Sequence, residues 1–113
     1  MDYSNVIASA HAAGMAAGNA INPIPMHVIE SDAKIYVVPD GPCGFSWVKI
    51  KGNTAFGKWA KKAGIARASY PNGLQISCRE FNQSMTRKEE YSFAYAYVLR
   101  GAGIDCHVES RMD

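Results

Sequence analysis

The stretch that decides the fold is SMTRKEEYSFAYAYVLRGAGIDCHV, residues 84–108. Its pattern predicts one long amphipathic helix, a glycine stop at Gly103 and a closing strand. Thr86 and Glu89 have the spacing of a T-x-x-E capping box, which marks the start of a helix. The apolar residues fall on one face of a helical wheel, namely Tyr91, Ala94, Tyr95, Val98, Leu99 and Ala102. We expect this helix to cover the core with that face.

Composition limits the class of protein. A chain of 113 residues that is 48% hydrophobic suits a single domain with a real core, residues 1–113. The net charge of +2 does not by itself demand a nucleic acid or an acidic membrane as partner. Three separated cysteines and no signal peptide predict free thiols in a reducing compartment. No apolar run approaches the ~20 residues that span a bilayer, so we expect a soluble cytoplasmic protein without a membrane partner.

The first half of the chain predicts one helix followed by strands. Residues 3–20 are rich in alanine and should be helical. Residues 26–30 have the pattern of a short edge strand. The β-forming runs 34–38 and 45–51 flank a loop of prolines and glycines, which predicts that these two strands pair as a hairpin.

The second half continues the alternation of helices and strands. Asn53 or Thr54 can cap a helix at residues 55–63. Asn72-Gly73 lies between β-forming runs at 66–70 and 74–79, which is a strong hairpin signal. The sequence therefore predicts an α+β domain in the order α-β-β-α-β-β-α-β, with an antiparallel sheet of about five strands and helices mainly on one face.

Four glycines have predicted structural roles. Gly64 and Gly103 each end a helix before an isoleucine, so both should have positive φ. Gly14 and Gly18 lie one turn apart in the first helix. This spacing predicts close packing against another element, which is either the domain's own sheet or a second copy of the chain.

Several motifs in the chain are similar to those of a known family. They are GMAAGNA followed by P-x-P-M, then CGFSWVKI, FNQSMTRKEEYSFAYAYVLRGAGI and a C-terminal SRMD. With them the chain resembles, over nearly its whole length, a family of small proteins associated with bacteriophages and other mobile elements. The resemblance implies a phage or plasmid accessory gene, but no activity, ligand or catalytic residue.

Catalytic and metal chemistry find little support in the sequence. Structural zinc sites usually take their ligands in closely spaced pairs. Only Cys106 and His107 are neighbours, and a strand would point them to opposite faces. A catalytic thiol needs a histidine beside it, but nothing places His27 or His107 near Cys43. We therefore predict no metal, no cofactor and no enzymatic activity.

The densest positive region supplies one candidate binding site. Its cations are Lys51, Lys58, Lys61, Lys62 and Arg67. Trp47, Trp59 and Tyr70 occur in the same region, so phosphate contacts and base stacking can be combined there. The alternative is a solvated helix face with Trp59 turned inward, because Trp59 belongs to the apolar stripe of its helix.

An aromatic pair on the long helix supplies the other candidate site. Phe93 and Tyr97 lie one turn apart on its polar face, close to Glu90 and Arg100. Such a pair must be covered by the N-terminal helix, by a second subunit in a homodimer, or by a partner. Aromatic residues with a polar rim are typical of interfaces.

We predict a binding protein that occupies a surface of a host protein or protein–nucleic-acid machine, as a host-defence inhibitor does. The alternative is a nucleic-acid-binding domain that uses the lysine-rich helix.

Overall fold

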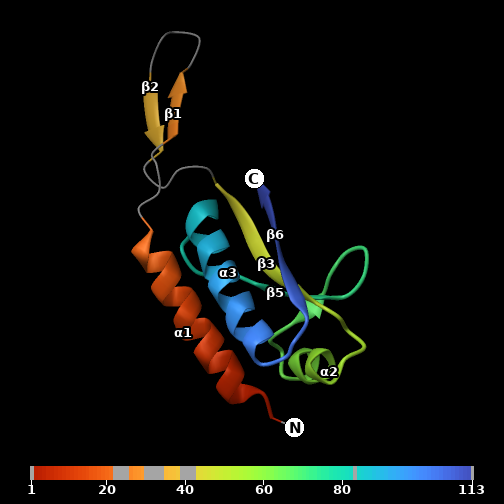
Figure 1. Ribbon diagram of the computed structural model, residues 1–113. Coiled ribbons are helices and arrows are strands. Elements are labelled where there is room, and N and C mark those ends of the chain that lie inside the picture. Colours follow the sequence, from red (N-terminus) through yellow and green to blue (C-terminus); the bar gives the residue numbers. More distant parts are fainter. Residues whose placement is uncertain (1, 22–25, 30–34, 39–42, 83, 113) are drawn as a thin grey trace.

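A four-stranded antiparallel sheet in the order β4-β5-β3-β6 organises the described part of the chain (Figure 1). The computed structural model describes residues 2–21, 26–29, 35–38, 43–82 and 84–112. The helices in this part are α1 (Ser4–Ala20), α2 (Ala55–Lys62) and α3 (Met85–Gly101). The strands are β1 (Met26–Ile29), β2 (Ile35–Val38), β3 (Gly44–Ile50), β4 (Arg67–Ala68), β5 (Leu74–Ser77) and β6 (Cys106–Met112). The prediction of a single α+β domain is confirmed.

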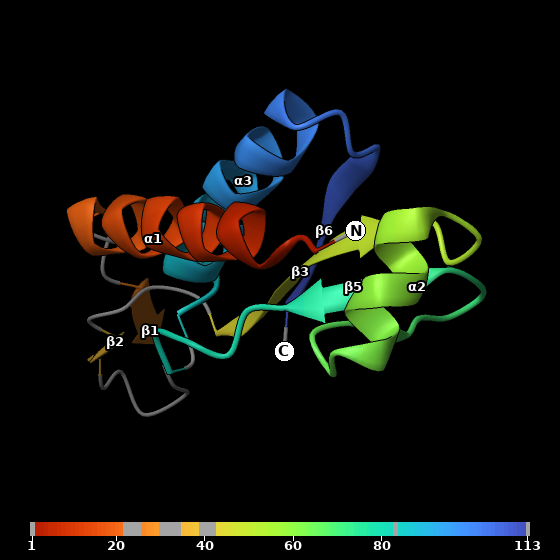
Figure 2. The ribbon, with the colours of Figure 1, turned by 90° about the horizontal axis from the view of Figure 1, so that it is seen from below.

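Helices α1 and α3 are stacked on one side of the sheet. Helix α3 packs against β3 and β6, and α1 packs along α3 (Figure 2). Ser46 Oγ of β3 donates a hydrogen bond of 2.9 Å to Ser92 Oγ of α3, so the sheet and this helix are also joined through a buried polar contact. Helix α2 lies at one end of the sheet, where Phe56 and Trp59 pack against Tyr3. The opposite face of the sheet carries none of these three helices.

The two glycines of α1 are pressed against α3 and the segment before it. Gly14 faces the ring of Tyr91, and a Cβ added at Gly14 would lie 2.6 Å from that ring. Gly18 faces the ring of Phe81 in the same way. The close packing predicted for these glycines is therefore within the chain, onto a helix and a loop rather than onto the sheet. None of the described helices is both long enough and apolar enough to cross a membrane.

The predicted pairing of residues 34–38 with 45–51 is wrong. Strand β2 pairs with β1 instead, in a separate two-stranded antiparallel sheet in which Met26 lies opposite Val38. Strand β3 is flanked by β5 and β6, so neither of its edges is open to β2. The main sheet therefore has four described strands rather than about five. The element order α-β-β-β-α-β-β-α-β has one strand more than the predicted order.

The predicted capping box at the start of α3 is also wrong. The N-cap is Ser84, whose Oγ accepts a hydrogen bond of 3.3 Å from the backbone N–H of Arg87. The backbone N–H of Ser84 bonds to the carbonyl oxygen of Phe81, which is a turn that starts the helix before Thr86 is reached. Glu89 instead accepts a hydrogen bond of 2.9 Å from Ser110 Oγ, so it ties α3 to β6.

Helix α3 is buried on a broader face than its apolar stripe predicts. Tyr91, Tyr95 and Leu99 of the stripe are buried, but so are three further residues, Lys88, Ser92 and Ala96. The reason is that α3 lies between two layers, with α1 on one side and the sheet on the other. The residues towards the sheet are small or polar, and a search for apolar periodicity misses them.

Predictions that depend on local signals are confirmed in the middle of the chain. Thr54 is the N-cap of α2, with its Oγ1 accepting a hydrogen bond of 3.0 Å from the backbone N–H of Gly57. Gly64 and Gly103 have φ angles of +78° and +84°. Strands β4 and β5 form the predicted hairpin, and Gly73 in its loop has positive φ. The prolines in residues 22–25 also predict an extended link after the first helix, and these residues lie outside the described ones.

Candidate functional site

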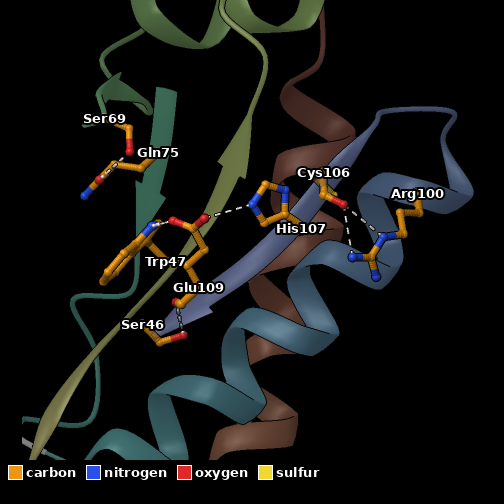
Figure 3. Close-up of polar contacts among 8 residues, drawn as sticks. All are labelled: Ser46, Trp47, Ser69, Gln75, Arg100, Cys106, His107 and Glu109. Carbon is orange, nitrogen blue, oxygen red and sulfur yellow. Dashed lines mark hydrogen bonds and ion pairs between the residues drawn. The ribbon is translucent and has the colours of Figure 1, made fainter. Parts of the chain in front are cut away.

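The face of the sheet that points away from α1 and α3 carries a mixture of aromatic and charged side chains. Alternation along β3 buries Ser46, Val48 and Ile50 and points Phe45, Trp47 and Lys49 outward. Their register partners on β6 are Arg111, Glu109 and His107 in that order. In Figure 3 the side chains of Trp47, His107 and Glu109 project from the strands with both helices behind them.

A groove of about 530 Å³ is lined by outward residues of this face and also by Lys88 of α3, and we call it the cationic groove. Its lining includes four cations, and none of its described lining residues is acidic. The cations are Arg67, Arg79, Lys88 and Arg111. The other side chains are Phe45, Ser46, Trp47, Ser69, Tyr70, Gln75, Ser77 and Cys78. Positive charge without a balancing carboxylate among the described lining residues favours an anionic ligand.

Hydrogen bonds fix the side chains along one side of this groove. Trp47 Nε1 donates to Glu109 Oε1 at 3.0 Å, and His107 Nε2 lies 3.0 Å from Glu109 Oε2 (Figure 3). The contacts from His107 and from Trp47 lower the pKa of Glu109, so its carboxylate is ionised at neutral pH. The indole of Trp47 is thus held in one orientation, and the carboxylate of Glu109 is already engaged by Trp47 and His107.

A second chain of hydrogen bonds crosses the groove floor. Ser69 Oγ donates to Gln75 Oε1 at 3.0 Å (Figure 3). Gln75 Nε2 in turn donates to Ser77 Oγ at 2.9 Å. These three side chains are neutral, so the part of the groove lining between β4 and β5 adds no charge. Tyr70 follows β4 and is 93% exposed, so its ring is available to a ligand.

The two ends of the groove differ in their aromatic chemistry. At one end the ring of Phe45 contacts two cations, with Lys88 Nζ 5.3 Å and Arg111 Cζ 5.5 Å from the ring centroid. These are cation–π distances, so this ring serves to hold positive charge. At the other end Trp47 and Tyr70 have no cation placed over them among the described contacts. The groove therefore offers both charge and stacking surface.

The structure separates the cations that sequence reasoning grouped together. Arg67 lines the cationic groove, but Lys58, Lys61 and Lys62 are exposed on α2, outside its lining. Lys51 forms an ion pair of 3.1 Å with Asp105. Trp59 is half-buried and packs on Phe56 and Tyr3, as expected if it belongs to the apolar stripe.

Sequence reasoning missed Arg79, Lys88, Arg111 and Phe45. The signal that was available is the alternation in residues 44–50, which places Phe45 and Trp47 on one face of a strand. The cations come from three other segments that only the tertiary fold brings together.

The predicted partner-binding residues lie on the outer side of α3. Phe93 is 51% exposed and Tyr97 is 78% exposed. Glu90 is half-buried on the same helix. Arg100 uses Nε and Nη2 to donate two hydrogen bonds, of 3.2 and 3.0 Å, to the carbonyl oxygen of Cys106 (Figure 3). Arg100 therefore holds the start of β6 in addition to any role towards a partner.

The thiols and histidines of the described residues do not form a reactive cluster. Burial raises the pKa of Cys78 and that of Cys106, which keeps both thiols protonated and poorly nucleophilic at neutral pH. His11 Nδ1 hydrogen-bonds with the hydroxyl of Tyr91 at 2.6 Å, and burial raises the pKa of that phenol. No group of three or more possible metal ligands gathers in the part of the chain that the structure covers.

Comparison with known proteins finds no match to a family model, to a curated protein or to a solved structure. The resemblance to a phage-associated family therefore stays a prediction. The function has to be inferred from the chemistry of the exposed faces described above.

Proposed function

We propose that the protein is a binding protein, not an enzyme, and that it binds single-stranded nucleic acid in the cationic groove. The observation that carries this proposal is the composition of the groove, with four cations and three aromatic rings and no acidic residue among its described lining. The proposal takes up the alternative function that the sequence suggested, nucleic-acid binding, and moves it from the lysine-rich helix to the cationic groove.

The cations of the groove match the phosphate of a nucleotide, and its aromatic rings match the base. Guanidinium and ammonium groups neutralise phosphates, which supplies most of the affinity of non-specific binding. Exposed aromatic rings stack with bases at roughly 1–3 kcal/mol each. Arg67 and Arg79 are exposed cations, Tyr70 is an exposed ring, and Trp47 is a half-buried ring that lines the same groove. A simple anion would use the cations but would not need the rings.

The shape of the face favours a single strand over a duplex. Reading a duplex usually requires an element that enters the major groove, such as a helix or a two-stranded ribbon. The cationic groove instead lies on the face of a sheet, with rings standing on and beside strands. Unpaired bases can lie flat on such rings, as they do on sheets that bind single-stranded RNA.

Replacing the exposed ring of Tyr70 tests this proposal against the other candidate face. The Tyr70→Ala variant should bind a fluorescent single-stranded oligonucleotide about tenfold more weakly, because one stacking contact is lost. The matched control is Tyr97→Ala, which removes a similarly exposed tyrosine from α3 and should leave the affinity unchanged. Fluorescence anisotropy at low salt measures both. Absence of binding by the wild-type protein to any single-stranded DNA or RNA would refute the proposal.

A second candidate function is favoured by the exposed pair on α3. Phe93 and Tyr97 are 51% and 78% exposed and lie one turn apart. Large exposed aromatics with a polar rim, here Glu90 and Arg100, have the composition of an interface core. The corresponding proposal is that α3 docks a protein, either a second copy or a host protein, as an accessory protein of a phage or mobile element would in inhibiting a host defence.

The double substitution Phe93→Ser and Tyr97→Ser tests this second candidate. The melting temperature should change little, because both rings are already largely exposed to solvent in the folded chain. If α3 forms a homodimer, light scattering should show a dimer for the wild type and a monomer for the variant. A fall in melting temperature of many degrees with unchanged association would identify the rings as part of the core and exclude this candidate.

A further inference from the structure

Lys88 is the one charged side chain among the residues that the structure shows as buried. It is 5% exposed, and the other buried polar residues are the serines Ser46, Ser84 and Ser92. Lys88 lies one turn after the N-cap of α3 and lines the Phe45 end of the cationic groove. Among the described residues, the one fully buried side-chain nitrogen or oxygen without a hydrogen-bond partner is Nε of Arg87, so the stem of Lys88 is buried while its ammonium group still reaches the groove.

No described carboxylate forms an ion pair with this ammonium group. It lies over the ring of Phe45, whose centroid is 5.3 Å from Nζ. The described residues that line the groove include no carboxylate. The nearby thiol of Cys78 does not supply a negative charge, because burial raises its pKa. A cation–π contact uses the face of the ring and leaves the N–H donors of the ammonium group without acceptor atoms.

The surroundings increase the need for an anion. Arg111 contacts the same Phe45 ring at 5.5 Å, and Arg79 lines the same groove. Two cations thus lie beside one ring and a third lines the same groove, while the buried stem of Lys88 fixes the position of its ammonium group. A compact oxyanion with several acceptor oxygens satisfies such a set, because each oxygen can accept charge-assisted hydrogen bonds.

We propose that the Phe45 end of the cationic groove is a phosphate-binding subsite centred on Lys88. The inference rests on the proposed function in assigning this phosphate to a nucleic-acid strand, and it names the part of the groove that holds the strand in place. Phe45 is a positioning residue there, since its ring holds Lys88 and Arg111 and is not available for a base. Trp47 and Tyr70 take the bases further along the groove.

Thermal denaturation in inorganic phosphate tests the subsite without any nucleic acid. At equal ionic strength, replacing chloride by phosphate should raise the melting temperature of the wild type by about 5 °C once phosphate exceeds its dissociation constant about tenfold. Phosphate also stabilises proteins non-specifically. The quantity to compare is therefore the phosphate-induced rise in melting temperature of the wild type and of Lys88→Met. This variant keeps the apolar stem and removes the charge.

The matched control is Lys58→Met on α2, where the lysine is exposed and outside the groove. Lys58→Met should respond to phosphate like the wild type, while Lys88→Met should lose the specific part of the shift. Equal shifts in the wild type and Lys88→Met would overturn the proposal. If Lys88→Met does not fold, Arg79→Gln provides the test, since Arg79 is exposed and should still weaken the response.

Oligonucleotides distinguish the source of the phosphate. Lys88→Met should reduce affinity for a single strand about tenfold, as expected for loss of one charged contact. A higher wild-type affinity for 5′- or 3′-phosphorylated strands assigns the subsite to a strand end, and equal affinity assigns it to an internal phosphodiester. Strong oligonucleotide binding that Lys88→Met leaves unchanged refutes the subsite and keeps the proposed function. A specific phosphate shift without oligonucleotide binding refutes the proposed function and keeps the subsite.

Discussion

Replacing Arg67, Arg79 and Arg111 together by glutamine is expected to weaken single-stranded nucleic-acid binding about a hundredfold near ~0.1 M salt. Each phosphate contact on a single strand contributes about 0.7 to the slope of log affinity against log salt concentration, so three lost contacts lower that slope by about two. The three arginines are exposed on the open side of the sheet. The fold should therefore survive the substitution, and the melting temperature checks this. Titrations at several salt concentrations give the slope.

The three lysines of α2 provide a matched control for this triple variant. Replacing Lys58, Lys61 and Lys62 by glutamine removes the same number of charges from α2, at positions outside the lining of the cationic groove. That variant should keep nearly the whole salt slope. The reverse result, in which the lysine variant loses the slope and the arginine variant keeps it, would move the site to the lysine-rich helix and contradict the proposed function.

Replacing Gly14 by alanine is expected to lower the free energy of unfolding by about 1–3 kcal/mol, the range for overpacked sites. The added Cβ would lie 2.6 Å from the Tyr91 ring, a distance that van der Waals repulsion does not allow. The ring cannot easily move away. It is 7% exposed, it packs beside Phe81 and Tyr95, and its hydroxyl hydrogen-bonds with His11 at 2.6 Å.

Replacing Gly101 by alanine should not lower the free energy of unfolding. Gly101 is the last residue of α3, and a Cβ added there meets nothing within 4 Å. Alanine in a helix is favoured over glycine by up to about 1 kcal/mol, so Gly101→Ala should stabilise the protein or leave it unchanged. Urea denaturation of both variants measures the contrast. A Gly14→Ala variant as stable as the wild type would show that α1 and α3 adjust their separation freely.

The parts of the fold that were predictable from the sequence are those with a local physical cause. Thr54 caps α2 because its hydroxyl reaches an N–H three residues later, and Gly64 ends that helix through its positive φ. The hairpin of β4 and β5 likewise depends on a few adjacent residues. The start of α3 was placed wrongly because Ser84 and Thr86 are both acceptable caps, and the turn at Phe81 decides between them.

The pairing of strands and the cationic groove depend on contacts between distant residues. Residues 34–38 have the same β-forming pattern whether they pair with β1 or with β3. What excludes β3 is that β5 and β6 take both of its edges. Lys88 illustrates the same problem for the site. In the sequence it is followed by Glu89 and Glu90, which is typical of a solvated helix face, but the fold buries it beside Phe45.

The position of β6 beside β3 also determines when the domain can fold during translation. Strand β3 ends at Ile50, but its partner β6 begins only at Cys106, and α1 packs on a helix that begins at Met85. At ~5–20 residues per second, the ribosome needs on the order of ten seconds to make the intervening chain. For that time the nascent chain exposes the packing face of α1 and one unpaired edge of β3. The main sheet is therefore completed after synthesis of β6 and not progressively, so the newly made chain is the form most exposed to chaperones and to aggregation.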